Sequence, residues 1–126
     1  MNTLIVEKVE PYSPGDESAS VLLRSERGLI EVFCYPCDLK VGDFVENRLS
    51  VLDADVRAAY LVDWPDEEKV ERSIERLEKV GPYAYKGCAR TLDQQKGLIE
   101  VLGFCIDVGE VLFDGPVEFE FSRVDI

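Results

Sequence analysis

The sequence predicts a mainly β protein: a small antiparallel β-barrel or sandwich built from two similar β-meander halves, with one amphipathic α-helix connecting them. Three features support this fold class. A six-residue segment occurs twice, several short segments alternate apolar and polar residues, and one helical apolar stripe lies between them. The chain has 126 residues, the length of one ordinary domain. We therefore expect a single domain over residues 1–126, with halves at about 19–60 and 83–126.

A short internal repeat divides the chain into these halves. Residues 27–32, Arg-Gly-Leu-Ile-Glu-Val, recur at 96–101 as Lys-Gly-Leu-Ile-Glu-Val, so five of the six positions are identical. A Val-Gly-acid sequence follows each copy, at 41–43 and at 108–110. Because each copy has the order of a turn glycine, an apolar strand and an acidic loop, we expect the same supersecondary unit twice.

Segments with strand character occur in both halves. The pattern is clearest at residues 117–122, where Val117, Phe119 and Phe121 alternate with polar neighbours. This period of two predicts one buried face and one solvated face. The segments expected to form strands are 3–9, 19–24, 29–35, 44–52, 83–91, 98–106 and 117–122.

One amphipathic helix is expected from about Asp63 to Val80, between the halves. Val70, Ile74 and Leu77 follow one another at spacings of four and three, which places them on one narrow face that can pack on a sheet. The aspartate at the start can cap the first turn, and the Gly-Pro pair after the end stops the helix. Trp64, the one tryptophan, is expected to fasten the start of this helix to the core.

The segment from Leu39 to Val45, Leu-Lys-Val-Gly-Asp-Phe-Val, resembles the start of a strand in OB-type small barrels. The resemblance covers under a tenth of the chain, and it favours a small barrel, including an OB-like one. Because one fold carries many functions, the resemblance implies nothing about activity.

Composition excludes several function classes. The chain has no histidine, so it cannot carry a Ser-His-Asp or Cys-His catalytic system or a histidine metal site. With 26 acidic and 14 basic residues, the net charge is −12, which repels nucleic acid and anionic lipid and attracts basic proteins. No segment is apolar over the length of a membrane span or has the pattern of a signal peptide, so we expect a cytoplasmic location.

Four cysteines offer a weak metal hypothesis. Cys34 and Cys37 have the spacing of a zinc knuckle or a redox pair, and Cys88 and Cys105 bring the number of thiols to four. The second pair is widely separated, and the first does not begin a helix as redox pairs do. We therefore interpret the cysteines as small buried residues and predict no cofactor, with zinc as the alternative.

A carboxylate pair is the main catalytic hypothesis. Glu31 and Glu100 occupy the same position of the repeat, inside apolar strands. If a pseudo-two-fold axis related the halves, the two carboxylates could converge and work as an acid and a base. Strand alternation alone, however, predicts that each faces water. The sequence therefore favours a protein that is not an enzyme.

Aromatic and basic residues alternate near the start of the second half. Tyr83 and Tyr85 lie close to Lys86 and Arg90, a combination that single-stranded nucleic acid can use for stacking and phosphate contacts. The acidic stretches on both sides oppose such a ligand, so an OB-like nucleic-acid-binding barrel is an alternative rather than the main prediction.

The favoured function is therefore a small acidic binding protein. Its expected partner is a basic macromolecule, as for an inhibitor or an immunity-type protein, because a concentrated negative surface steers and binds a basic partner. The acids expected to contact the partner are Asp53, Asp55, Asp66, Glu67, Glu68, Glu118 and Glu120.

Overall fold

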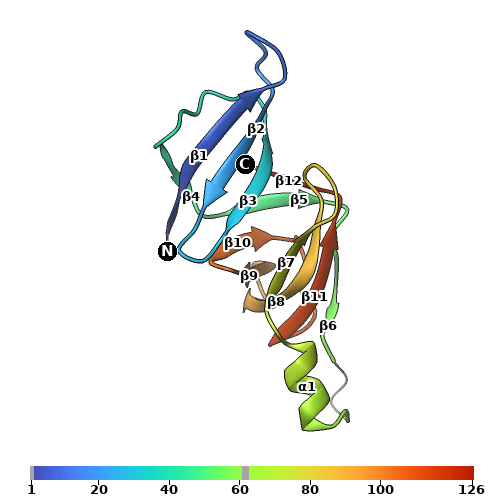
Figure 1. Ribbon diagram of the computed structural model, residues 1–126. Coiled ribbons are helices and arrows are strands. Elements are labelled where there is room, and N and C mark those ends of the chain that lie inside the picture. Colours follow the sequence, from blue (N-terminus) through green and yellow to red (C-terminus); the bar gives the residue numbers. More distant parts are fainter. Residues whose placement is uncertain (1, 61–62) are drawn as a thin grey trace.

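The computed structural model describes residues 2–60 and 63–126, and it is mainly β, as predicted (Figure 1). Twelve strands and one short helix make up the regular structure of these residues. Their bounds are β1 Thr3–Pro11, β2 Ala19–Arg24, β3 Leu29–Cys34, β4 Phe44–Glu46, β5 Leu49–Leu52, β6 Asp55–Ala58, α1 Asp66–Arg72, β7 Arg76–Lys79, β8 Tyr85–Asp93, β9 Leu98–Val101, β10 Phe104–Asp107, β11 Pro116–Phe121 and β12 Arg123–Asp125.

All twelve strands belong to one hydrogen-bonded sheet that does not close on itself. The strand order is β4-β1-β2-β3-β12-β5-β10-β9-β8-β11-β6, and β7 pairs with β8 beside this path. The sheet is bent, so that β1 to β4 lie at one end of the molecule and β7, β8, β11 and α1 at the other (Figure 1). The sheet is therefore an open one, bounded by the strands β4 and β6.

The chain exchanges strands between its two halves. β12 lies between β3 and β5, and it pairs parallel with β3 and antiparallel with β5. β5 in turn pairs parallel with β10, and β6 pairs with β11. The predicted antiparallel sheet therefore contains two parallel pairings, because strands of each half are inserted beside strands of the other half.

The two copies of the repeated segment occupy comparable places at first. Each forms the second strand of an antiparallel hairpin, β2–β3 for the first copy and β8–β9 for the second. After these strands the two copies follow different courses. β3 runs on to Cys34 and a turn with a cis Tyr35–Pro36 bond, whereas the chain after β9 reverses at Leu102-Gly103 into β10.

Alternation places the core between the bent parts of the sheet. On β11, Val117, Phe119 and Phe121 are buried, as expected, and the glutamates between them face outward. The buried apolar side chains of the other strands join them in one cluster that contains Phe104, Ile99 and Leu23. One core thus includes residues from both halves.

Among the described residues, no helix is long and apolar enough to span a membrane.

The predicted helix from Asp63 to Val80 is wrong over more than half of its length. α1 covers only Asp66–Arg72, Pro65 holds the N-cap position without a capping side chain, and residues 76–79 form the strand β7. The apolar stripe does not act as one face: Val70 and Ile74 are 69% and 59% exposed, while Leu77 packs on the core from β7. Pairing of β7 with β8 overrides the helical spacing, because it lets Leu77 reach the core as part of a strand.

Two predicted strands are also divided. The segment 44–52 forms β4 and β5, which pair with different neighbours, β1 for the former and β10 and β12 for the latter. The segment 98–106 forms β9 and β10, joined by a tight turn in which Leu102 and Gly103 both have positive φ. The first break falls at Asn47-Arg48 and the second at Leu102-Gly103, each inside a segment that was predicted as one continuous strand.

Gly87 allows β7 to pack against β8. A Cβ atom at this position would lie 2.0 Å from the carbonyl oxygen of Arg76. We expect Gly87→Ala to lower the free energy of unfolding by about 2 kcal/mol, because the backbone of β7 would have to shift. Urea unfolding measures this. The control is Gly28→Ala, whose Cβ would have only ordinary contacts, at 3.4 Å or more, and which should change stability by about 0.5 kcal/mol at most.

Because residues 76–79 form the strand β7 rather than a helix, Leu77 and Ile74 should contribute differently to stability. Leu77→Ala should lower the free energy of unfolding by about 2 kcal/mol, since Leu77 packs on the core, and Ile74→Ala should change it by about 0.5 kcal/mol or less. Denaturant titration of both variants checks this. An equal loss of unfolding free energy in the two variants would instead indicate that both side chains pack on the core from the predicted amphipathic helix.

Candidate functional site

The outward face of β11 carries the candidate site. β11 lies between β6 and β8, and its register places Glu118 opposite Arg57 and Glu120 opposite both Asp55 and Lys86. Because Val56 of β6 packs toward the core, its neighbours Asp55 and Arg57 face outward beside the two glutamates. The sheet therefore gathers charged residues from three strands on one surface.

Three of the predicted partner-binding acids line one groove. Asp53, Asp55 and Glu120 border a hollow of about 490 Å³ whose other walls include Val80, Ala84 and Ser122. We call this hollow the acidic groove. The Asp53 carboxylate accepts a hydrogen bond from the Ser122 hydroxyl at 2.7 Å, and Asp55 lies 2.9 Å from Arg57.

Glu120 differs from its two neighbours in the acidic groove. It is exposed, and no ion pair joins it to a cation of the chain among residues 2–60 and 63–126. Its Cα partner on β6 is another acid, Asp55. Like charges directly opposite each other on neighbouring strands are unfavourable, so this part of the groove favours a cation.

The three predicted acids of α1 lie apart from the groove. Asp66, Glu67 and Glu68 form the exposed first turn of a helix that has no buried residue and that projects from the end of the molecule (Figure 1). The described residues provide no ion pair to any of the three. The predicted acids therefore form two sets rather than one continuous surface.

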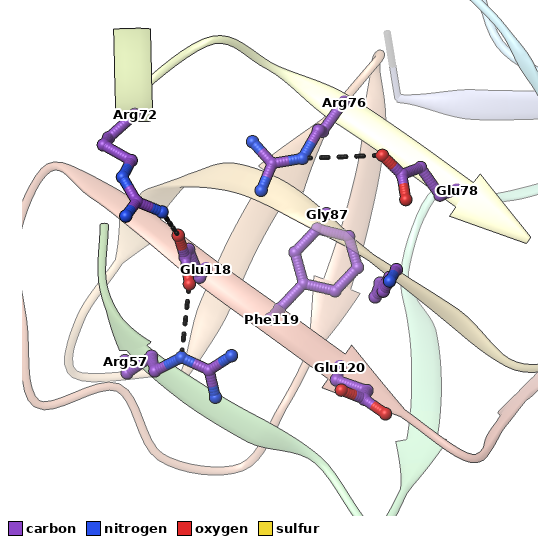
Figure 2. Close-up of a pocket in the computed structure, with 9 residues that line it drawn as sticks. Arg57, Arg72, Arg76, Glu78, Gly87, Glu118, Phe119 and Glu120 are labelled. Carbon is purple, nitrogen blue, oxygen red and sulfur yellow. Dashed lines mark hydrogen bonds and ion pairs between the residues drawn. The ribbon is translucent and has the colours of Figure 1, made fainter. Parts of the chain in front are cut away.

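Glu118, the last of the predicted acids, points into a second hollow that is rich in cations. Its side chain is 18% exposed and lies 3.2 Å from Arg57 and 3.7 Å from Arg72. Figure 2 shows it between these two arginines. Arg76 and Lys86 complete the basic lining of this hollow, which measures about 330 Å³. We call it the arginine pocket.

Sequence reasoning missed the arginine pocket. Its cations come from four elements, β6, α1, β7 and β8, and no motif connects them. One signal existed: residues 69–96 form the net-positive part of an otherwise acidic chain, and they contain three of the four cations. The pairing of β7 with β8 was needed to bring them together.

The two catalytic candidates are not brought together. Glu31 lies 2.8 Å from Lys79, and this hydrogen bond raises the pKa of the Lys79 ammonium. Glu100 lies 2.7 Å from Arg90, its neighbour across β8 and β9. Each carboxylate thus has its own cation on a different strand, and no contact between the two is found in the described chain.

The four cysteines are free and do not assemble into a site. Cys34 is buried and hydrogen-bonded with Cys37, Cys88 lies buried on β8, and Cys105 lies half-buried on β10. Within residues 2–60 and 63–126, no three or more Cys, Asp or Glu side chains are arranged to hold a metal ion. The zinc alternative therefore has no ligand set there.

The tyrosines of the nucleic-acid hypothesis, Tyr83 and Tyr85, form contacts within the protein itself. Tyr85 is 4% exposed, and its hydroxyl accepts a hydrogen bond from the Glu31 amide. Tyr83 is half-buried against Phe33, and its hydroxyl bonds with Tyr12 and Ser20. The buried ring of Tyr85 cannot stack on a base, so the expected pair of stacking tyrosines is not present as predicted.

Trp64 has a different neighbour from the one expected. It is half-buried, and the guanidinium of Arg72 lies 5.4 Å from the centre of its ring. Trp64 therefore orients a cation of the arginine pocket, whereas the sequence predicted that it fastens the helix to the core.

The charged residues that lie outside the ion pairs of the described chain are mostly acidic. Eleven pairs in the described residues join ten of the 14 basic residues, including all eight arginines, to ten of the 26 acids. Sixteen acids and four lysines remain outside these pairs. The charge available to a partner is therefore mostly negative.

Comparison with known proteins adds no assignment. The chain matches no protein-family model, and neither the curated proteins nor the solved structures compared with it give a match. The site therefore has to be interpreted from its own geometry.

The Cys34 thiol has a consequence for pH dependence. Burial, and after it the hydrogen bond with Cys37, raises the pKa of Cys34 from 9.0 to about 12. The unfolded chain loses the Cys34 proton near pH 9 and the folded chain does not. The contribution of the protonated Cys34 thiol to the free energy of unfolding is therefore complete below pH 9 and decreases as the pH rises toward 12.

Urea unfolding near pH 8 and near pH 10 tests this contribution. The free energy of unfolding should fall between the two pH values, and it should fall less in Cys34→Ser, which keeps the side-chain size and cannot titrate in this range. An identical fall in both proteins would contradict the assignment.

Proposed function

We propose that this protein is a small acidic cytosolic binding protein that recognises a basic protein partner, in the manner of an inhibitor or immunity-type protein. The acidic groove receives a lysine or arginine side chain of that partner. The observation that carries the proposal is the convergence of Asp53, Asp55 and Glu120 beside an apolar wall.

Electrostatics supports a cationic guest. Asp55 and Glu120 are register partners on β6 and β11, and within the described chain Glu120 forms no ion pair, although Lys86 is its register partner on β8. An incoming ammonium or guanidinium would relieve the repulsion between them and gain charge-assisted hydrogen bonds, which are stronger than neutral ones.

The apolar part of the groove suits the stem of the same side chain. Val80 is 51% exposed, and Ala84 lies next to it through a hydrogen bond between their backbones. Lysine and arginine carry an apolar stem behind a charged end, so the stem can cover Val80 and Ala84 while the end reaches the carboxylates.

The remaining acids support the approach of such a partner. Sixteen acids and four lysines lie outside the ion pairs formed among the described residues, and three of those acids form the projecting first turn of α1. A field of one sign accelerates encounter with an oppositely charged protein, and it acts more on the association rate than on the final contacts. The α1 acids fit a steering role, and the groove acids fit a contact role.

A pair of charge-matched variants tests the proposal. The groove variant carries Asp53→Asn, Asp55→Asn and Glu120→Gln. The control carries Glu17→Gln, Glu26→Gln and Glu110→Gln, at three exposed acids that form no ion pair within the described chain. Both variants change the net charge by the same amount.

Each protein is immobilised and exposed to an extract of its native cell. We expect the wild type and the control to retain the same basic protein, released by salt, and the groove variant to bind it at least about tenfold more weakly. Retention by all three proteins, or equal loss from both variants, would show that the groove is not the contact surface.

A further inference from the structure

The arginine pocket has features that the acidic groove and its basic partner do not explain. Arg57, Arg72, Arg76 and Lys86 surround it from four different elements of a protein whose net charge is −12. Figure 2 shows the guanidinium groups of Arg57, Arg72 and Arg76 on different sides of the hollow. Four cations gathered in one place are unusual in such a chain and require a physical reason.

Three of these cations have no hydrogen bond to a carboxylate among the described residues. Arg72 lies 3.7 Å from Glu118, and Arg76 lies 3.7 Å from Glu78; these are the two longest of the eleven ion pairs. Both separations exceed hydrogen-bond length, so neither guanidinium has a hydrogen bond to its carboxylate. Lys86 takes part in no ion pair among the described residues, although Glu78 and Glu120 are its register partners.

Arg57 differs from the other three, because it is held by two carboxylates. It lies 2.9 Å from Asp55 and 3.2 Å from Glu118, and both contacts are hydrogen bonds. Arg57 therefore acts mainly as an anchor for Glu118. The hydrogen-bonding capacity left for a ligand lies with Arg72, Arg76 and Lys86.

The Arg72 guanidinium and the backbones of Arg76 and Lys86 are held in place before any ligand arrives. The ring of Trp64 lies 5.4 Å from the Arg72 guanidinium, and Glu118 lies 3.7 Å from it. Arg76 and Lys86 belong to the paired strands β7 and β8, which hold their backbones in fixed register. Cations held in place in this way lose less entropy on binding than free side chains do.

We propose that the arginine pocket binds the phosphate group of a small phosphorylated ligand. Arginine presents a planar fork of N–H donors that matches phosphate oxygens, and lysine adds a compact charge. A phosphate carries close to two negative charges near neutral pH and offers several acceptor oxygens, which suits three cations better than a single carboxylate does. A volume of about 330 Å³ accommodates a small molecule and not a folded chain.

The net charge of the protein does not prevent this. Charges separated by more than about 10 Å are largely screened at 0.1 M ionic strength, so the anion responds mainly to the lining of the pocket itself. In that lining four cations outnumber three glutamates, Glu78, Glu118 and Glu120. The extended backbone of a nucleic acid would in addition have to pass acids outside the pocket, Asp55 and those of α1.

Titration with inorganic pyrophosphate tests the proposal. Calorimetry should show one binding site on the wild type, and NMR should show the largest amide shifts at Gly87 and Phe119, which line the pocket. Arg76→Gln and Lys86→Gln should each weaken binding at least about tenfold, since each removes a charged hydrogen-bond donor.

Lys96→Gln is the matched control. Lys96 is an exposed lysine without an ion pair in the described chain, like Lys86, and it lies in the turn at the other end of β8. Its removal changes the net charge equally and should leave pyrophosphate binding within about twofold. Both lysines are exposed, so both variants are expected to fold, and this pair decides the outcome even if Arg76→Gln is unstable.

Three results would overturn the proposal. They are no pyrophosphate binding to the wild type, equal weakening by Lys86→Gln and Lys96→Gln, and binding of citrate as tight as that of pyrophosphate. The last would show a site for carboxylates. Because the acidic groove is not needed for this titration, a failure here leaves the proposed partner site untouched, and the converse also holds.

Discussion

The register of β11 between β6 and β8 is the constraint on which both hollows depend. Burial of Val117, Phe119 and Phe121 fixes which face of β11 is outward, and the backbone hydrogen bonds fix what lies opposite each outward glutamate. A slip by one residue would turn the glutamates into the core, which the buried face forbids. Core packing and site geometry are therefore set by the same strand.

This register gives the two outward glutamates opposite surroundings. Glu118 lies opposite Arg57 and belongs to a network of ion pairs. Glu120 lies between an acid, Asp55, and a lysine, Lys86, that forms no ion pair within the part of the chain that the structure describes. The acidic groove and the arginine pocket are therefore neighbours that share Glu120 in their linings.

The sequence was informative where a local pattern has only one solution. Strict alternation at residues 117–122 can bury only one face, and a glycine before an apolar segment was sufficient to predict both hairpins. It was misleading where two patterns agree with the same residues. Val70, Ile74 and Leu77 have helical spacing, yet only Leu77 reaches the core, because β8 offers backbone hydrogen bonds to residues 76–79.

By itself, the sequence determined the mainly β class, the negative charge and the lack of histidine chemistry. It also determined which residues of β11 are buried and which face outward. These properties follow from composition and from contacts that are local along the chain. Only the tertiary structure decided which acids share a groove, which cations surround a pocket, and that Glu31 and Glu100 have separate partners. Pairings such as β6 with β11 or β5 with β10 join residues about 60 positions apart, and strand register between such distant segments is selected by the packing of the whole core.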